Sequence, residues 1–351
     1  MPIVDDEQIL HDIGLTHQFQ QHFSNSGNGR LIDNDGNYWY VSRENELLNF
    51  ISLLENNISV PIGRMLHNSA ADSFELILSP LAEVNYGLFG KKKRARLLSN
   101  YWNTFGWGSY ETKSHSIVTN VYPAIISGFY LSLAEFQNGT RNRIQWQQVQ
   151  DTLILCDIEA LNKTISTPQD LGFMPWTTMV ERQNAGVDIL LEKQNVGWSI
   201  DGRLAYVLPC DMVNRLIFNL GAYAEKLPSK VSEVWNLKGL DKRYCGSFLH
   251  IVQSLKELFL AGDEFVYLNE QNNWDLVIDS HLKPFGIGSV KFVKCEGNVD
   301  YFQVALEPNA PLVIGKLAGL WERANGKKSS CNIILSDSIF QVEIKSSLTY
   351  N

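Results

Sequence analysis

The sequence predicts an α/β (α+β) fold built from two pseudo-symmetric repeats, each an antiparallel sheet covered by helices. Three observations support this prediction: strand-like alternation beside two Asp-Gly pairs, amphipathic runs with helical spacing, and a Phe-Gly-x-Gly element that occurs twice. The two occurrences lie at 105–108 and 285–288. Each one follows an amphipathic run and precedes alternating residues, so much of the chain aligns with itself.

Composition excludes several classes of protein. The chain has 351 residues, enough for two or three domains, and its 44% hydrophobic content excludes a disordered chain. A net charge of −8 disfavours a nucleic-acid-binding surface. No apolar run is long enough to span a bilayer, and the acidic start does not resemble a signal peptide. The five widely spaced cysteines are typical of a reducing compartment, so we expect a cytoplasmic protein.

The first segment, 1–28, is polar, and we expect a short helix at about 5–14 followed by a linker. Alternating residues then flank the Asp-Gly pair at 35–36, which predicts a β-hairpin, and a second Asp-Gly pair at 201–202 predicts its counterpart. Asp33 and Asp35 could suggest a calcium loop, but the spacing and distal Glu of an EF-hand are absent. The recurrence of the Asp-Gly pair favours a turn.

Helices and strands are expected in the same order after each hairpin. Three helices are predicted in each repeat, at about 44–57, 63–80 and 92–104 and again at 211–225, 242–261 and 272–282. A strand pair follows each Phe-Gly-x-Gly element, at 109–121 and 289–306, then a Pro-led helix, at 123–139 and 311–326, and a closing strand, at 150–158 and 336–344. The resulting domains are 29–158 and 197–351.

Two further expectations concern the parts outside these elements. The connecting segment, 159–196, belongs to neither repeat, although 186–191 could form an extra strand or helix. Gly106 and Gly286 recur where a helix reverses into a strand. We therefore expect both to have a positive φ or to lie in close contact with another element.

The order of elements and several short motifs resemble the 4-vinyl reductase domain family, which is related to the small subunits of the TRAPP trafficking complex. The motifs are Phe105-Gly106-Trp107-Gly108, Pro123 with Gly128-Phe129, Phe285-Gly286-Ile287-Gly288, Asn309-Ala310-Pro311 and Ala318-Gly319-Leu320. The resemblance covers about 29–158 and 197–344. It implies two tandem α/β ligand-binding domains of the 4-vinyl-reductase type.

The sequence indicates no catalytic residue, metal site or cofactor. The seven histidines form no metal-ligand pattern, and neither a Gly-x-Ser-x-Gly motif nor a phosphate-binding loop is present. Sensor members of the resembled family end in a cysteine cluster that binds zinc. Here Phe340 and Val342 stand where that cluster has its last cysteine and its phenylalanine. We therefore expect no zinc of the family type.

A concentrated run of positive charge precedes the third helix of the first repeat. It consists of Lys91, Lys92, Lys93, Arg94 and Arg96. The corresponding region of the second repeat carries acidic residues instead, so the repeat does not require the run. It is interpreted either as a solvated helix start or as a contact for an acidic partner or an anionic surface.

Aromatic residues near the two Phe-Gly-x-Gly elements are the candidate ligand-binding residues. They are Trp102, Trp107, Tyr122, Phe129, Phe248, Phe285, Phe302 and Trp321. Such residues either fill a core or enclose an apolar pocket. The sequence thus favours a non-enzymatic protein that binds a small hydrophobic ligand or scaffolds a partner protein. The alternative is an enzyme or biosynthetic accessory acting on a hydrophobic, tetrapyrrole-like substrate.

Overall fold

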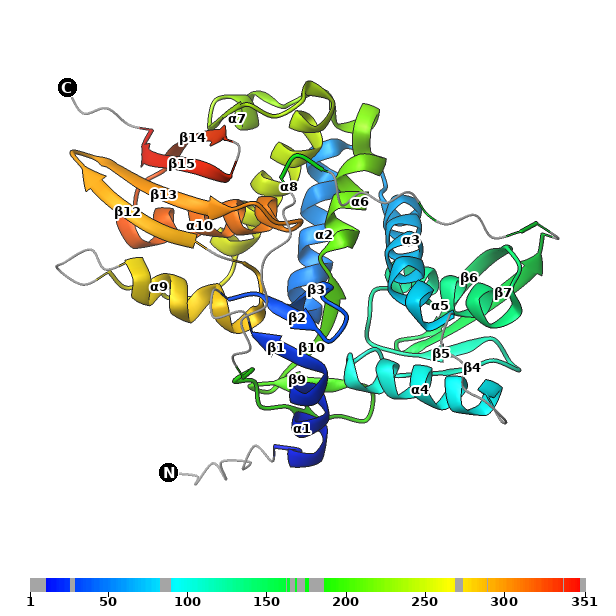
Figure 1. Cartoon of the computed structure of the whole chain (residues 1–351). Coiled ribbons are helices and arrows are strands. Elements are labelled where there is room, and N and C mark those ends of the chain that lie inside the picture. The colour runs from blue at the N-terminus through cyan, green and yellow to red at the C-terminus, as the bar shows by residue number, and fades with distance from the viewer. Residues whose placement is uncertain are drawn as a thin grey trace, which may run out of the picture.

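The computed structural model is a mixed α/β protein in which helices separate and cover three sheets (Figure 1). The structure describes residues 11–25, 29–82, 90–161, 163–164, 168, 174–176, 186–268, 274–288, 290–336 and 338–347. The predicted α+β class is confirmed. Within these residues, no helix is both long and apolar enough to cross a membrane.

A central six-stranded sheet joins segments that are far apart in the sequence. Its strand order is β1-β2-β3-β10-β9-β8. The strands are β1 (Phe23–Asn25), β2 (Leu31–Asp33), β3 (Tyr38–Arg43), β8 (Glu192–Lys193), β9 (Trp198–Ile200) and β10 (Arg203–Pro209). Because β3 pairs antiparallel with β10, the two hairpins lie in one sheet, near the middle of the molecule in Figure 1.

Both Asp-Gly pairs form turns, as predicted. Asp201 and Gly202 both have positive φ, the conformation of a type I′ hairpin turn. In the first hairpin the Asp33 carboxylate accepts hydrogen bonds from the backbone N–H groups of Asp35 and Asn37 and from the Trp39 indole. Its oxygens are therefore used to hold the turn together.

The two outer sheets have the same strand order. The first is β4-β5-β7-β6, and the second is β12-β13-β15-β14 with one further strand, β11, paired parallel to β14. Their strands are β4 (Ser109–Glu111), β5 (Ser116–Val118), β6 (Asn142–Gln150), β7 (Leu153–Ala160), β11 (Trp235–Lys238), β12 (Val290–Glu296), β13 (Val299–Ala305), β14 (Ser329–Leu335) and β15 (Ile339–Ser346). The remaining neighbours are antiparallel.

The helices also follow one order in the two halves of the chain. They are α1 (Ile13–His22), α2 (Glu44–Ile58), α3 (Gly63–Ala82), α4 (Gly90–Thr104), α5 (Pro123–Asn138), α6 (Asp211–Leu220), α7 (Ser229–Ser232), α8 (Lys242–Ala261), α9 (Trp274–His281) and α10 (Ala310–Asn325). Helix α3 packs on α5, and α8 packs on α10. A Cβ on Gly128 would lie 2.3 Å from the His67 carbonyl oxygen, and one on Gly315 would lie 2.5 Å from that of Val252. The small residues in mid-helix therefore permit close helix packing.

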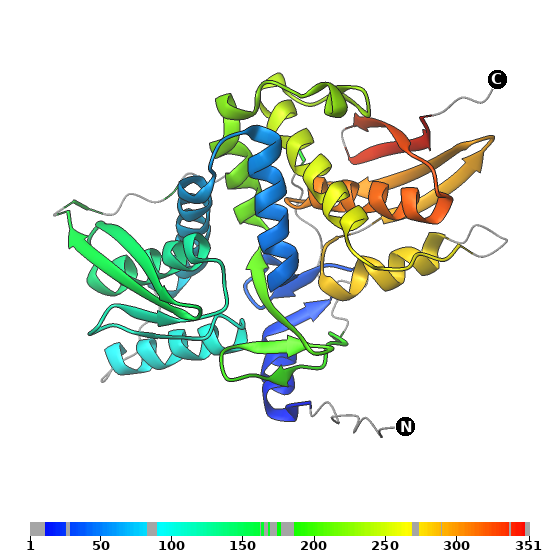
Figure 2. The same ribbon diagram turned by 180° about the vertical axis from the view of Figure 1, so that it is seen from behind.

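Elements of the two halves pack against each other across the centre of the molecule. Helix α2 packs on α8, and α6 packs on α3, as the views from the front and from behind both show (Figures 1 and 2). Gly106 lies against the second hairpin, where a Cβ would meet the Trp198 ring at 2.7 Å. Gly286 lies against the first hairpin, where a Cβ would meet the Leu31 Cβ at 2.7 Å. The segments 29–158 and 197–351 therefore share one sheet.

Gly106 and Gly286 confirm the expectation about their backbone. Their φ angles are +80° and +65°, and each lies in contact with a strand from the other half. Gly108, which follows in the first element, has φ +84° and approaches the Val118 carbonyl oxygen. The sequence predicted the conformation of these glycines but not the element that each one contacts.

Other sequence expectations were untested or wrong. The helix expected at about 5–14 falls mostly on residues 1–10, which lie outside the described part of the chain, and the described helix that follows is α1 (Ile13–His22). Residues 186–191 form neither a strand nor a helix. They run beside α1, and the Leu191 N–H donates to Thr16 Oγ1 at 3.0 Å. The strands β6 and β14 were not predicted.

Candidate binding cavity between the two halves

The predicted ligand-binding residues of the first half lie in a packed core. Trp107 and Phe129 stack with their ring centroids 4.2 Å apart, and Phe74 packs edge-on against Trp107 at 5.2 Å. The Trp107 indole donates to the Val207 carbonyl at 2.8 Å. Trp102 is also fully buried, and Tyr122 is half-buried directly before α5. The two cavities described below are lined by none of the four predicted residues of this half, which are Trp102, Trp107, Tyr122 and Phe129.

The predicted residues of the second half lie apart from one another. Phe248 packs against Phe340 and Trp176, and Phe302 packs against Trp274. The indole of Trp321 donates to Asp300 Oδ2 at 2.7 Å. Phe285 differs from these residues because it is half-buried beside two cationic groups, Arg43 and Lys316. The eight predicted residues therefore do not converge on one site.

A cavity of about 490 Å³ lies where the two halves meet, between α2, α8, α10 and strand β3. Its walls are mainly apolar and come from all four elements. The apolar lining residues are Tyr40, Val41, Leu47, Phe50, Leu53, Leu255, Leu258, Phe259, Ala261, Ile287 and Leu312. Its volume falls in the range of pockets that bind small molecules. None of the eight predicted ligand-binding residues lines this cavity.

The counterpart of this region in the first half is filled by aromatic side chains. Helices α5 and α10 both have 16 residues and both end before a left-handed glycine, Gly139 or Gly326, so Phe129 corresponds to Lys316. In the Phe-Gly-x-Gly elements, Trp107 corresponds to Ile287. A smaller side chain and a lysine thus replace two stacked rings, and the space becomes a cavity.

Charged groups gather at one end of the cavity. Glu264 accepts a hydrogen bond from His281 at 3.1 Å and lies 3.9 Å from Arg43, which also pairs with Glu46 at 3.3 Å. The His281 hydrogen bond, with the nearby charges of Lys316 and Arg43, lowers the pKa of Glu264 to about 2. The Glu264 carboxylate is therefore ionised throughout the neutral range.

Lys316 is the most deeply buried of these charged groups, with 7% of its surface exposed. Its Nζ lies 5.5 Å from the centroid of the Phe285 ring and 5.9 Å from that of Phe259. Burial lowers the pKa of its ammonium group, although the charges of Glu264 and Glu46 oppose that shift. The cavity thus combines a large apolar wall with one buried cation.

A second cavity, of about 350 Å³, lies between α1, the end of α4 and the loop before β9. Its lining is mixed, with Asp12, Gln18, Asn103 and Gln194 among the polar residues. Several of the lining groups are glycines and backbone at the surface. Its walls are less apolar than those of the first cavity and its volume is smaller, so the cavity beside Lys316 is the better candidate site.

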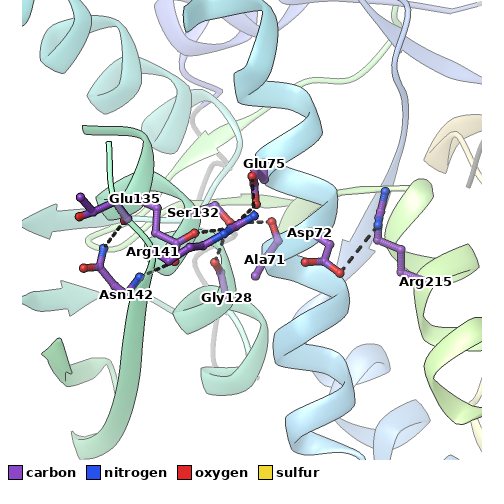
Figure 3. A network of polar contacts seen from close by, with 10 residues as sticks. Ala71, Asp72, Glu75, Gly128, Ser132, Glu135, Arg141, Asn142 and Arg215 are labelled. Carbon is purple, nitrogen blue, oxygen red and sulfur yellow. Dashed lines mark hydrogen bonds and ion pairs between the residues drawn. The ribbon is translucent and has the colours of Figure 1, made fainter. Parts of the chain in front are cut away.

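A polar network in the first half connects α3, α5 and β6 (Figure 3). Arg141 bridges Glu75 and Glu135, with 2.6 Å contacts to each, and Glu135 also accepts from the Asn142 N–H at 2.7 Å. In the second half, Glu322 accepts from the Ser329 N–H at 2.7 Å and pairs with Lys256 at 2.5 Å. Because both carboxylates bind the start of a strand, we interpret these networks as structural.

Three buried reactive groups are poorly suited to act as nucleophile or base. Burial raises the pKa of both Cys156 and Cys331 to about 12, which disfavours the nucleophilic thiolate. His67 stacks on Trp146 at 4.6 Å, and burial lowers its pKa to about 4. Among the described residues, His, Cys, Asp and Glu form no group of three or more that could hold a metal.

The basic run lies at the start of α4, a helix with no acidic residue in its first turn. Lys91, Lys92, Lys93 and Arg96 are exposed, whereas the Arg94 guanidinium lies over the Phe136 ring at 5.0 Å. The run is on the first half and does not approach the lining of the cavity. It therefore forms a separate charged surface.

Comparison of the chain with protein-family models, curated proteins and solved structures found no match.

Proposed function

We propose that this protein binds a small hydrophobic molecule, without catalysing a reaction, in the cavity between α2, α8 and α10. The observation that carries this proposal is the cavity of about 490 Å³ itself, which has apolar walls and a single deeply buried cation. Small-molecule sites are typically concave and mainly apolar, with a few polar groups, so a cavity of this size and lining at the junction of the two halves favours a ligand.

We further infer that the two halves descend from one duplicated unit, as the resemblance to tandem 4-vinyl reductase domains implies. The identical strand order of the outer sheets and the reciprocal contacts of Gly106 and Gly286 support this inference. In this view, one copy kept a solid aromatic core and the other opened a binding cavity at the corresponding place.

Filling the cavity with the side chains of the first half tests the proposed function. The double substitution Ile287→Trp with Lys316→Phe places there the residues found at the corresponding positions 107 and 129. The neutral probe N-phenyl-1-naphthylamine should fluoresce on binding to the wild type. The filled variant should lose that signal because the apolar space is occupied.

The matched control is Leu276→Trp, which adds an indole at a position on α9 that is 61% exposed. This control should bind the probe as the wild type does. Native mass spectrometry of the wild type and the filled variant would reveal any co-purified molecule. Equal probe binding by the wild type and by a folded, filled variant would refute a binding role for this cavity.

A further inference from the structure

Lys316 is a buried cation without a counter-ion in direct contact. It is 7% exposed and lines the cavity, and within the described residues its Nζ forms no hydrogen bond and no ion pair within 4 Å. Burying an ammonium group without such partners is costly, and two aromatic rings at 5.5 and 5.9 Å offset only part of that cost.

The fold does not require a lysine at this position. The corresponding residue of the first half is Phe129, which is fully buried and stacks on Trp107. Gly315, directly before Lys316, makes the same close contact with a helix as Gly128 does before Phe129. The backbone geometry is therefore retained with either side chain, and a residue that destabilises the fold points to a role in binding.

Glu264 and Glu46, the carboxylates whose charges act on Lys316, have other partners. Glu264 pairs with His281, and Arg43 pairs with Glu46 and approaches Glu264. Arg203 and Asp263, which also line the cavity, are exposed and opposite in charge. Lys316 is thus the buried charged group of the cavity that lacks a direct ionic partner among the described residues.

We propose that Lys316 receives the carboxylate of a hydrophobic monocarboxylic acid whose hydrocarbon chain occupies the apolar part of the cavity. This inference rests on the proposed function and specifies its ligand. A single carboxylate would give the Lys316 ammonium the counter-ion that it lacks, and a hydrogen bond between two ionised groups is stronger than one between neutral groups. A phosphate monoester would bring a second negative charge toward Glu46 and Glu264, so the monocarboxylate fits better.

Two probes with the same chain separate the head group from the hydrocarbon. Decanoate and decanol differ in charge but carry chains of equal length, and calorimetry measures the Kd of each. The wild type should bind decanoate more tightly than decanol. Lys316→Met, which keeps the length of the side chain, should weaken decanoate binding by about 10- to 100-fold and change decanol binding by less than about twofold.

Two further variants serve as controls for the position and the charge of Lys316. Lys328→Met removes an exposed lysine and should leave the Kd of both probes unchanged. Lys316→Arg keeps the charge and should retain much of the preference for decanoate. The Tm of Lys316→Met should equal or exceed that of the wild type, because a buried charge is removed, which shows that the variant is folded.

The outcomes distinguish this inference from the function on which it rests. If the wild type binds decanol and decanoate equally, and Lys316→Met alters neither, Lys316 is not a carboxylate anchor although the cavity still binds hydrophobic molecules. If Lys316→Met weakens both probes to the same extent, the lysine contributes only as part of the wall. If the wild type binds neither probe, the proposed function itself fails.

Discussion

Helices α5 and α10 occupy corresponding places in the two halves, yet one covers a solid core and the other a cavity. On α5, Phe129 stacks against Trp107, whereas on α10 the corresponding Lys316 faces open space beside Ile287. Both helices have 16 residues and both end before a left-handed glycine. A filled core therefore goes with two stacked rings at these positions, and a cavity goes with an isoleucine and a lysine.

The largest expected loss of stability comes from placing a lysine in the first half, where the corresponding position is filled by an aromatic ring. Phe129→Lys should lower the free energy of unfolding by about 3–5 kcal/mol, because an ammonium group would enter a core with no cavity and no ionic partner. Urea denaturation would measure the change. The reciprocal Lys316→Phe should be neutral or stabilising, and a comparable loss from both substitutions would contradict the assignment of core and cavity.

Trp107 lies beside Phe129, and Ile287 lies beside Lys316. Truncating each of these neighbours to alanine should lower the free energy of unfolding by different amounts. Trp107→Ala should cost about 3–5 kcal/mol, since this fully buried indole contacts several aromatic rings and donates a hydrogen bond to Val207. Ile287→Ala should cost less than about 2 kcal/mol because Ile287 is only half-buried at the cavity wall. Similar losses in the thermal and urea transitions of the two variants would argue against a cavity beside Ile287.

Acid should destabilise the first half through His67. Burial, with the charge of Arg64, lowers the pKa of His67 from 6.5 to about 4, so the unfolded chain binds the proton more readily. The stability due to neutral His67 is complete above about pH 6.5 and falls by at most about 3 kcal/mol as the pH decreases to 4. His67→Leu should flatten the urea-derived stability over that pH range, whereas a profile as steep as that of the wild type would show that other groups dominate.

The smallest expected effect tests a feature that both halves share. Gly106→Val and Gly286→Val should each cost about 1–3 kcal/mol, because both glycines have positive φ and touch a strand of the opposite half. Gly326 has positive φ, but a Cβ there would have no heavy atom within 4 Å, so Gly326→Ala should cost only about 1 kcal/mol. Equal losses at Gly106 and Gly326, measured with alanine at both, would mean that the hairpin contact contributes nothing.

Local patterns in the sequence predicted much of the secondary structure. The Asp-Gly pairs marked the hairpins, and apolar spacing located most of the helices. Strand β6 was missed although Ile144 and Trp146 alternate with polar residues, because this short alternation is followed by a polar stretch with glutamine at 147, 148 and 150. Strand β14, which opens with two serines, was missed for a similar reason.

The candidate site could not be predicted in the same way. Aromatic composition around the Phe-Gly-x-Gly elements is similar in the two halves, and periodicity does not reveal whether a ring fills a core or lines a cavity. Ile287 and Lys316 are far from α2 in the sequence. They line the same cavity as α2 only because the two halves pack against each other in the folded chain. Lys316 was not selected because a lysine within a helix is usually solvated.

The pairing of each Phe-Gly-x-Gly element with the opposite hairpin sets a constraint on how the chain acquires its structure during synthesis. Trp107 donates to Val207, a residue 100 positions later, and Gly106 packs beneath Trp198. The first half is therefore synthesised before the strands that contact Gly106 and Trp107. The surface around these two residues stays uncovered until those strands have been made. We therefore expect the two halves to complete their folding together. A chain cut between them would yield two fragments, each lacking the strands that contact its own glycine element.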